Sequence, residues 1–409
     1  MSSDKNGVSD IFKSCILNKN TIEEKIYSDE WRDGNIISIT NAESFEVGFD
    51  NFSKSPKGKF ISKKYIMYYI EKTLSECGAH PDDNIKNRVN HFNEIIDSLD
   101  VQREHRVVKQ AFGVNMGNSE KPINAGPLCF YEVPRHGEYI KLPFQDPFFK
   151  RPQSTKTVAQ LCVKSLDSIK ALEVAETLFN TFELSIYFLC AEKDTAFSIG
   201  SMTREISSFE PPIIYTEGSL YGMSKDRPKP INSIDLTRLI EFFPEKQNNL
   251  MEYFFNVILS PTNQVEKKIS RAVEWIGEAY RDKNRSSALL KVVVALEALF
   301  KVDESSIITA SIMASMAEQC AHISGKSIGE CLGIEKYVKD LYGRRSQIVH
   351  SGSNNIGENE LKNALTFSRT IIFNLLRLEV INKFKTMGEF QKQVREGKYR
   401  ACPLWSLDH

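Results

Sequence analysis

The sequence lacks three features that would each point to a particular class of protein. It has no excess of charge, because 53 Lys and Arg balance 53 Asp and Glu among 409 residues. It has no apolar run as long as a membrane span, since the most apolar stretch, residues 288–300, is interrupted by Lys291 and Glu297. Its first twenty residues show no signal-peptide pattern. We therefore expect a cytoplasmic protein that contacts no membrane, on which any nucleic-acid surface is a local patch.

Metal sites, cofactor sites and disulfides also lack their usual sequence signatures. The eight cysteines are scattered, and no pair has the CxxC spacing of a zinc site. No phosphate-binding loop, HExxH, GxSxG or kinase signature is present. Isolated thiols fit a reducing compartment. We expect no cofactor and no metal ligand.

What the sequence does have is the make-up of a globular protein of more than one domain. Hydrophobic residues make up 41% and charged residues 26%, as in soluble domains. A chain of 409 residues exceeds one ordinary core, which favours two or three domains.

Residues 1–234 predict a mixed α/β region. β-Branched and aromatic residues with Gly, Pro and Asn breaks indicate strands, and apolar residues at helical spacing indicate helices. The strand-like segments are 35–49, 106–144, 157–163, 196–202 and 212–216. The helical segments are 63–74, 85–99 and 165–189, and residues 225–232, with two prolines, predict a connector.

Residues 235–384 predict a purely helical domain with short connections, as in an antiparallel bundle. The expected helices are 236–258, 265–280, 287–300, 305–323, 335–349 and 358–384. The segment 287–300 is apolar almost all round, so we expect it to be the central buried helix. Residues 385–409 remain as a basic C-terminal tail, expected to be only partly ordered. The predicted fold class is thus α+β multidomain, with a mixed first half followed by an all-α bundle.

One constellation in this helical region carries recognisable chemistry. The segment LYGRRSQIVHSG, residues 341–352, contains Arg345 and, five residues later, His350. Arginine stays charged and holds a phosphate through two parallel hydrogen bonds, whereas histidine moves a proton near neutral pH. RNA supplies its own nucleophile, the 2′-hydroxyl, so this pair suits metal-free cleavage of RNA. A spacing of five places the two side chains on neighbouring helix faces. They converge on one cleft if the helix unwinds at His350.

The C-terminal part resembles the Apea-like HEPN family. The matching pieces are RAVEWIGEAY at 271–280, ALLKVVVALEALF at 288–300 and YGRRSQIVHSG at 342–352. The resemblance covers roughly a quarter of the chain, from about residue 271 to 378. It implies an all-helical domain that dimerises and acts as a metal-independent endoribonuclease, often in anti-phage defence or as a toxin that cuts RNA such as tRNA.

The resemblance also assigns site residues. The family's arginine and histidine match Arg345 and His350, and the acidic residue of its core helix matches Glu297. We take these three as catalytic candidates, and Arg344, Tyr342 and Ser346 as candidates for RNA binding or support. Some relatives carry a modifiable tyrosine two residues after the histidine. Here that position is Gly352, so this form of inactivation is not expected.

Structural roles for the same residues stay open at this point. Arg345 and Arg344 could form exposed salt bridges, and His350 could cap a helix C-terminus. Glu297, as the only acid of a very apolar helix, must reach a pole of the bundle or a partner such as Arg345. Tyr342 could serve only in packing.

Two alternative functions stay open, and the motif also predicts a partner. A HEPN-like module could bind RNA or protein without cutting, and a DNA-binding regulator is disfavoured because no recognition helix or basic stripe is visible. A single histidine in the motif favours a homodimer through the C-terminal helices, since cleavage profits from a base and an acid. Residues 1–234 are expected to sense a trigger such as a phage component, to hold the nuclease silent, or to position the substrate.

Overall fold

The computed structural model describes the chain in thirteen segments. These are residues 7–19, 35–77, 85–99, 103–111, 114–132, 157–190, 214–216, 219–221, 234–237, 250–301, 309–352, 355–377 and 384–400. Helices dominate the described residues, whose strands fall before residue 236. This is the expected α+β layout in its coarse form. Expected segments 196–202 and 225–232 lie outside the described residues.

By its internal contacts the chain divides into two compact units. Unit 1 comprises Met1–Val107 and Leu161–Thr177, and unit 2 comprises Val108–Gln160 and Leu178–His409. The sequence had placed one boundary after residue 234. The contacts instead assign residues 108–160, and the second half of the long helix predicted at 165–189, to the same unit as the C-terminal helices.

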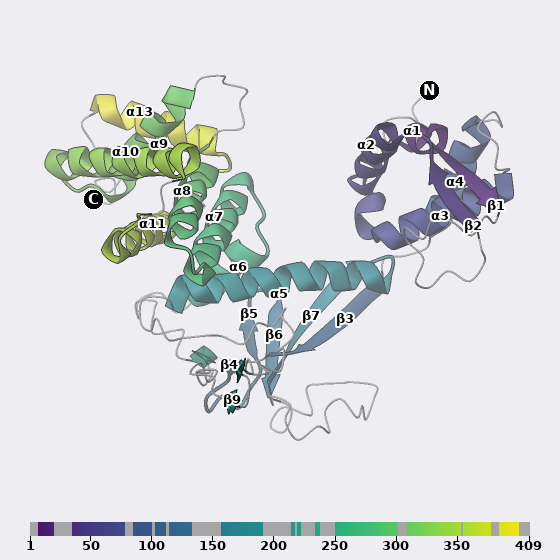
Figure 1. The fold of residues 1–409 in the computed structure, drawn as a ribbon, viewed down its shortest axis with the longest axis horizontal. Helices are drawn as coiled ribbons and strands as arrows, with labels where there is room; N and C mark the ends of the chain where they lie inside the picture. The colour runs from purple at the N-terminus through teal and green to yellow at the C-terminus, as the bar shows by residue number, and fades with distance from the viewer. Residues whose placement is uncertain are drawn as a thin grey trace. The chain divides into compact units, whose positions relative to one another are not determined.

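Unit 1 is built mainly from short helices. In chain order its elements are α1 (Val8–Lys13), β1 (Cys15–Lys19), β2 (Asn35–Ile39), α2 (Ala42–Ser53), the 3-10 turn η2 (Gly58–Phe60), α3 (Lys63–Cys77) and α4 (Ile85–Ser98). Strands β1 and β2 pair antiparallel, with Cys15 opposite Ile39 (Figure 1). The core of the helices includes Phe52 and Phe92, whose rings meet edge-on at 5.1 Å.

The prediction of strands across residues 35–49 is wrong in its second half. Only Asn35–Ile39 is a strand, and α2 begins at Ala42. The side chain of Asn41 accepts a hydrogen bond from the Ser44 amide at 3.1 Å, which starts the helix. Phe45 then lies four residues before Phe49, and their rings stack at 5.9 Å. The helix cap and the helical spacing of the aromatics outweigh their general preference for strands.

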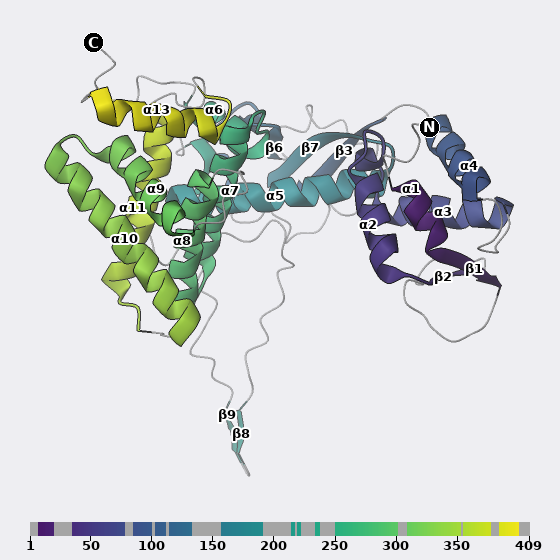
Figure 2. The same cartoon turned by 90° about the horizontal axis from the view of Figure 1, so that it is seen from above.

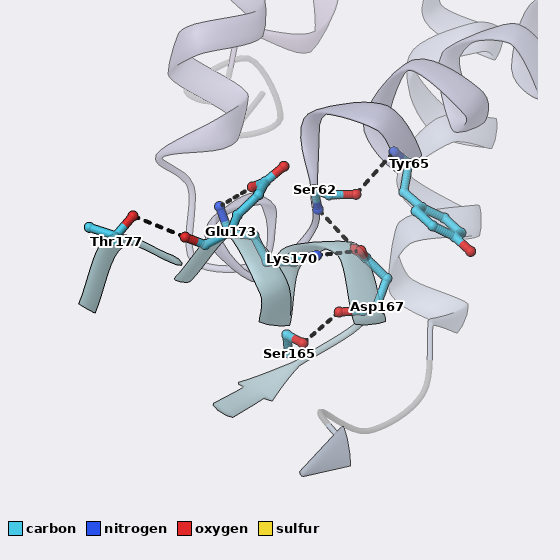
Figure 3. Close-up of polar contacts among 7 residues, drawn as sticks. All are labelled: Ser62, Tyr65, Ser165, Asp167, Lys170, Glu173 and Thr177. Atoms are coloured by element: carbon cyan, nitrogen blue, oxygen red, sulfur yellow. Dashed lines mark hydrogen bonds and ion pairs between the residues drawn. The ribbon is translucent and has the colours of Figure 1, made fainter. Parts of the chain in front are cut away.

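A buried carboxylate joins two helix starts in unit 1 (Figure 3). One oxygen of Asp167 accepts from the Ser62 amide, at the start of α3, and the other accepts from the Lys170 amide, both at 2.8 Å. The second bond caps α5 (Ser168–Cys190). The Ser62 hydroxyl in turn accepts from the Tyr65 amide. Segments more than 100 residues apart are thus held by one side chain.

Replacing this carboxylate should destabilise unit 1. In Asp167→Ala the buried Ser62 amide loses its acceptor and α5 loses its cap, which together should cost about 1–3 kcal/mol. Amide hydrogen exchange at the starts of α3 and α5 should become faster. Glu173→Ala is the matched control, because the Glu173 carboxylate is 43% exposed and contacts Lys170 Nζ at 3.4 Å. Equal exchange in both variants would contradict the assigned role.

Four strands form the largest sheet. Their order is β3 (Arg103–Gln110), β7 (Thr157–Ser165), β6 (Leu128–Glu132) and β5 (Ile123–Ala125). Two small pairs accompany it: β4 (Val114–Asn115) with β10 (Ile234–Asp235), and β8 (Ile214–Thr216) with β9 (Ser219–Tyr221). The strands predicted within 106–144, at 157–163 and within 212–216 are confirmed where the chain is described.

The helices of unit 2 follow the expected order, although the helix predicted at 236–258 is described only from Leu250. They are the second half of α5, then α6 (Leu250–Leu259), α7 (Gln264–Arg281), α8 (Arg285–Phe300), α9 (Thr309–Ser324), α10 (Ile328–Ser351), α11 (Glu358–Arg377) and α13 (Met387–Arg400). As expected, α8 is central: it contacts α7, α9, α10 and α11. It runs side by side with α7 (Figure 1 and Figure 2).

A chain of aromatic rings connects the sheet with the helices of unit 2. Phe130 of β6 lies 5.0 Å from Phe182 of α5, which lies 5.4 Å from Phe255 of α6. Farther along, Phe188 of α5 contacts Phe373 of α11 at 5.2 Å. Close aromatic pairs contribute beyond the area they bury, so the second half of α5 is firmly part of unit 2.

Two C-terminal expectations need correction. Helix α10 begins at Ile328, seven residues before the predicted start, because the Ser327 hydroxyl accepts from the Glu330 amide. The predicted tail from residue 385 is a helix through Arg400. Its Phe390 is buried, and its Gln391 side chain donates to the Phe300 carbonyl at 3.0 Å, at the end of α8. Within the described segments, no helix is both long and apolar enough to cross a membrane.

Helices α5 and α7 approach each other so closely that only glycine fits between them. A Cβ atom on Gly277 would clash with the Leu184 carbonyl oxygen. We expect Gly277→Ala to lower the free energy of unfolding by about 1–3 kcal/mol, because backbone must shift.

Gly333 provides the matched control for this substitution. It lies within α10, and a Cβ atom there would meet nothing within 4 Å. Gly333→Ala should raise stability by about 0.5–1 kcal/mol through helix propensity. Urea denaturation of both variants gives the comparison, and a stabilised Gly277→Ala would show that the contact is looser than described.

Candidate functional site

Three of the six candidate residues come together between α8 and α10. Arg345 of α10 points toward α8, where its Nε lies 3.8 Å from Oε1 of Glu297. Its guanidinium carbon lies 5.7 Å from the centre of the Tyr342 ring, about one turn earlier. Glu297 therefore has the partner that the sequence suggested.

The guanidinium of Arg345 is held on one edge and open on the other. Its Nε is buried and makes no hydrogen bond with any described residue. The side chain as a whole is 31% exposed, and its terminal nitrogens make no hydrogen bond within the described segments. An arginine in this state can accept an anion without first breaking a strong contact.

His350 does not join this cluster. It is exposed in the last turn of α10, without a hydrogen-bond or ion-pair partner among the described residues. The helix does not unwind there: it continues to Ser351 and ends at Gly352, whose φ of 64° is left-handed. Five helical residues span about 500°, so Arg345 and His350 point about 140° apart around the axis. The unwinding at His350 that would let this pair converge within one chain is thus not observed.

Arg344 and Ser346 occupy other faces of the same helix. Nε of Arg344 donates to Oε1 of Glu360 on α11 at 2.8 Å, and its NH1 donates to the Gln347 side chain at 3.2 Å. This is the structural ion pair that the sequence left open. Ser346 is half-buried and lies one turn before His350.

Arg344 also lines an open groove between α10 and α11. Its lining residues are Tyr337, Lys339, Asp340, Leu341, Gly343, Arg344, Gln347, Glu360 and Asn363. The ring of Tyr337 meets Phe367 edge-on at 5.0 Å. Burial, and then the Glu360 carboxylate, raise the pKa of the Tyr337 hydroxyl to about 12, so it remains a hydrogen-bond donor at neutral pH.

Sequence reasoning missed most of this groove. Gln347 lies inside the motif, but its neighbours Glu360 and Asn363 come from a separate helix. No fixed spacing within one segment predicts such a set. The only usable signal was the polar side of the segment predicted as helix 358–384.

No metal-binding cluster accompanies these residues in the described segments. No group of three or more His, Cys, Asp or Glu lies close enough there to hold a metal ion. The cysteines Cys320 and Cys15 are buried, and burial raises the pKa of both thiols, that of Cys15 to about 12.

No family model, no curated protein and no solved structure matches the chain.

Proposed function

We propose that this chain is a metal-independent endoribonuclease that cleaves RNA by attack of the 2′-hydroxyl on the adjacent phosphate. The observation that carries the proposal is the half-anchored guanidinium of Arg345, next to Glu297 and open to an anion. The resemblance to the HEPN family supports the same assignment.

The proposed reaction needs only groups that the protein and the RNA supply. Arg345 binds two oxygens of the scissile phosphate and stabilises the charge that develops on them. A His350 imidazole takes the proton of the 2′-hydroxyl, and the 2′-oxygen bonds to phosphorus. The bond to the 5′-oxygen then breaks, and a protonated imidazole returns a proton to the leaving oxygen. The products carry a 2′,3′-cyclic phosphate and a 5′-hydroxyl.

The divergence of Arg345 and His350 favours a site assembled from two chains. With about 140° between them on one straight helix, one phosphate cannot easily contact both from the same copy. A two-fold axis near the end of α10 would bring His350 of one copy toward Arg345 of the other. The proposed active site is therefore composite.

The exposed side of α10 supports a second copy as the partner. Ile328 and Leu332, one turn apart, are 81% and 62% exposed. His350 lies on this side as well. Exposed apolar residues along one helix side are typical of helix–helix interfaces.

The wider role follows the family resemblance. We propose action in the cytoplasm on RNA such as tRNA, in anti-phage defence or as a toxin. The described parts of residues 1–234 would serve in sensing, for example of a phage-derived trigger, or in substrate positioning.

One observation favours a second candidate function. A chain that does not place Arg345 and His350 together could instead be a HEPN-like module that binds RNA or protein without cutting. Such a module needs the open arginine but not the proton carrier.

Cleavage assays in EDTA separate these functions. Wild-type protein should cut RNA in the chelator, and His350→Ala should lose at least about 10²-fold in rate because the proton carrier is removed. Arg345→Ala should lose about 10²–10³-fold. Lys392→Ala is the control, since it removes a 79% exposed charge from α13, outside the proposed site. Cleavage that needs metal but survives His350→Ala would refute the mechanism.

Mixing two inactive chains tests the composite site. We expect Arg345→Ala and His350→Ala proteins, each inactive alone, to recover about a quarter of wild-type activity when mixed equally. Half of the random dimers are mixed, and each has one intact pair of groups. Light scattering should give the mass of a dimer. An active monomer, or mixtures without activity despite subunit exchange, would contradict a shared site.

A further inference from the structure

We propose that the groove between α10 and α11 binds a nucleobase of the RNA, beside the phosphate that is cut. This inference rests on the proposed function and concerns the part of the substrate that the protein recognises. Three features of the groove support it: neutral hydrogen-bonding groups without a partner among the described residues, a balance of positive and negative charge, and a position on α10 close to His350.

The groove presents several neutral hydrogen-bonding groups that no described residue occupies. The Gln347 amide accepts one hydrogen bond from Arg344 through Oε1, which leaves its nitrogen free. The Asn363 amide and the Tyr337 hydroxyl make no hydrogen bond with the described residues. Free amides and a phenol, close together, match the neutral donors and acceptors on the edge of a base.

The charges of the groove argue against a phosphate as its occupant. The lining contains two cations, Lys339 and Arg344, and two anions, Asp340 and Glu360. Both cations are already engaged, Arg344 with Glu360 and Lys339 with Glu335 at 3.3 Å. A site without surplus positive charge has little attraction for a phosphate, but it can hold an uncharged polar ring.

The groove also has an apolar surface on which a ring can rest. The buried Leu341 lines it, and the Tyr337 ring is fixed by its edge-on contact with Phe367. Aromatic side chains held in place in this way serve as stacking platforms for unpaired bases.

The position of the groove links it to the proposed chemistry. Gln347 lies three residues before His350, which is about 4.5 Å along the helix axis. A base bound at Gln347 therefore leaves its own ribose and phosphate within reach of His350. Because asparagine and glutamine amides pair best with adenine, we expect adenine to be preferred.

Binding of short RNAs tests this without relying on cleavage. Full-length His350→Ala protein, titrated with fluorescent twelve-residue oligomers of A, C or U at one salt concentration, should bind oligo-A tightest by anisotropy. Because the phosphates of the three oligomers are the same, differences among them report on the bases.

Substitutions in the groove should then remove the preference. Gln347→Ala with Asn363→Ala, added to this protein, should weaken oligo-A binding about tenfold and change oligo-C and oligo-U binding less than about twofold. Asn355→Ala is the matched control, an exposed amide outside the groove. Circular dichroism verifies that each variant folds.

The outcomes separate this inference from the proposed function. Equal binding of the three oligomers, binding of none, or an equal loss for all in the groove variant would overturn the base site. If wild-type protein cuts RNA but shows no base preference, only the base site fails. Selective binding that is lost with the groove, in a protein that cuts nothing, would support the base site and refute the nuclease.

Discussion

The burial of α8 is the constraint on which the C-terminal helices depend. From Ser286 to Phe300 no position of this helix is exposed, because α7, α9, α10 and α11 surround it. A carboxylate on such a helix needs water or a cation, since an isolated buried charge is very costly. Glu297 meets this need at the edge of α8, where Arg345 approaches it. The packing of the core thus fixes the place and the direction of the arginine at the proposed site, before any substrate is present.

The straightness of α10 sets a second constraint. Ser327 caps its start, and Gly352 ends it in a left-handed conformation, so all residues between them follow one helical geometry. Consecutive residues then point about 100° apart, and Arg344 and Arg345 serve different neighbours, one Glu360 on α11 and the other Glu297 on α8. His350 contacts neither Glu360 nor Glu297. A single chain therefore displays the proposed phosphate and proton-transfer groups on different sides, which is why a second copy enters the proposal.

Periodicity predicted the fold best where a helix face is continuously apolar. The segments that became α7 and α8 were expected within two residues of their bounds, because burial of one stripe, or of the whole surface, dominates their energetics. Helix α2 and the start of α10 were missed, since each begins at a single capping side chain, Asn41 and Ser327. In the candidate site, the scarcity of charge on α8 indicated that Glu297 needs a partner such as Arg345. The groove could not be predicted in this way, because Gln347 and Asn363 become neighbours only through the packing of two helices.

The three sides of α10 together suggest how one RNA strand would lie. The side toward α11 has neutral amides in a charge-balanced groove. The side toward α8 holds an arginine with an open edge, and the solvent side carries the histidine at the helix end. The parts of a nucleotide have matching properties. A nucleobase is neutral and polar, a phosphate is anionic, and a 2′-hydroxyl gives up its proton only when a proton acceptor lies near it. In the proposed dimer, the groove and His350 of one copy and Arg345 of the other would therefore contact the base, the 2′-hydroxyl and the phosphate of one strand. Because residues 344, 345 and 347 point in different directions, base recognition and phosphate binding can be altered separately on this helix.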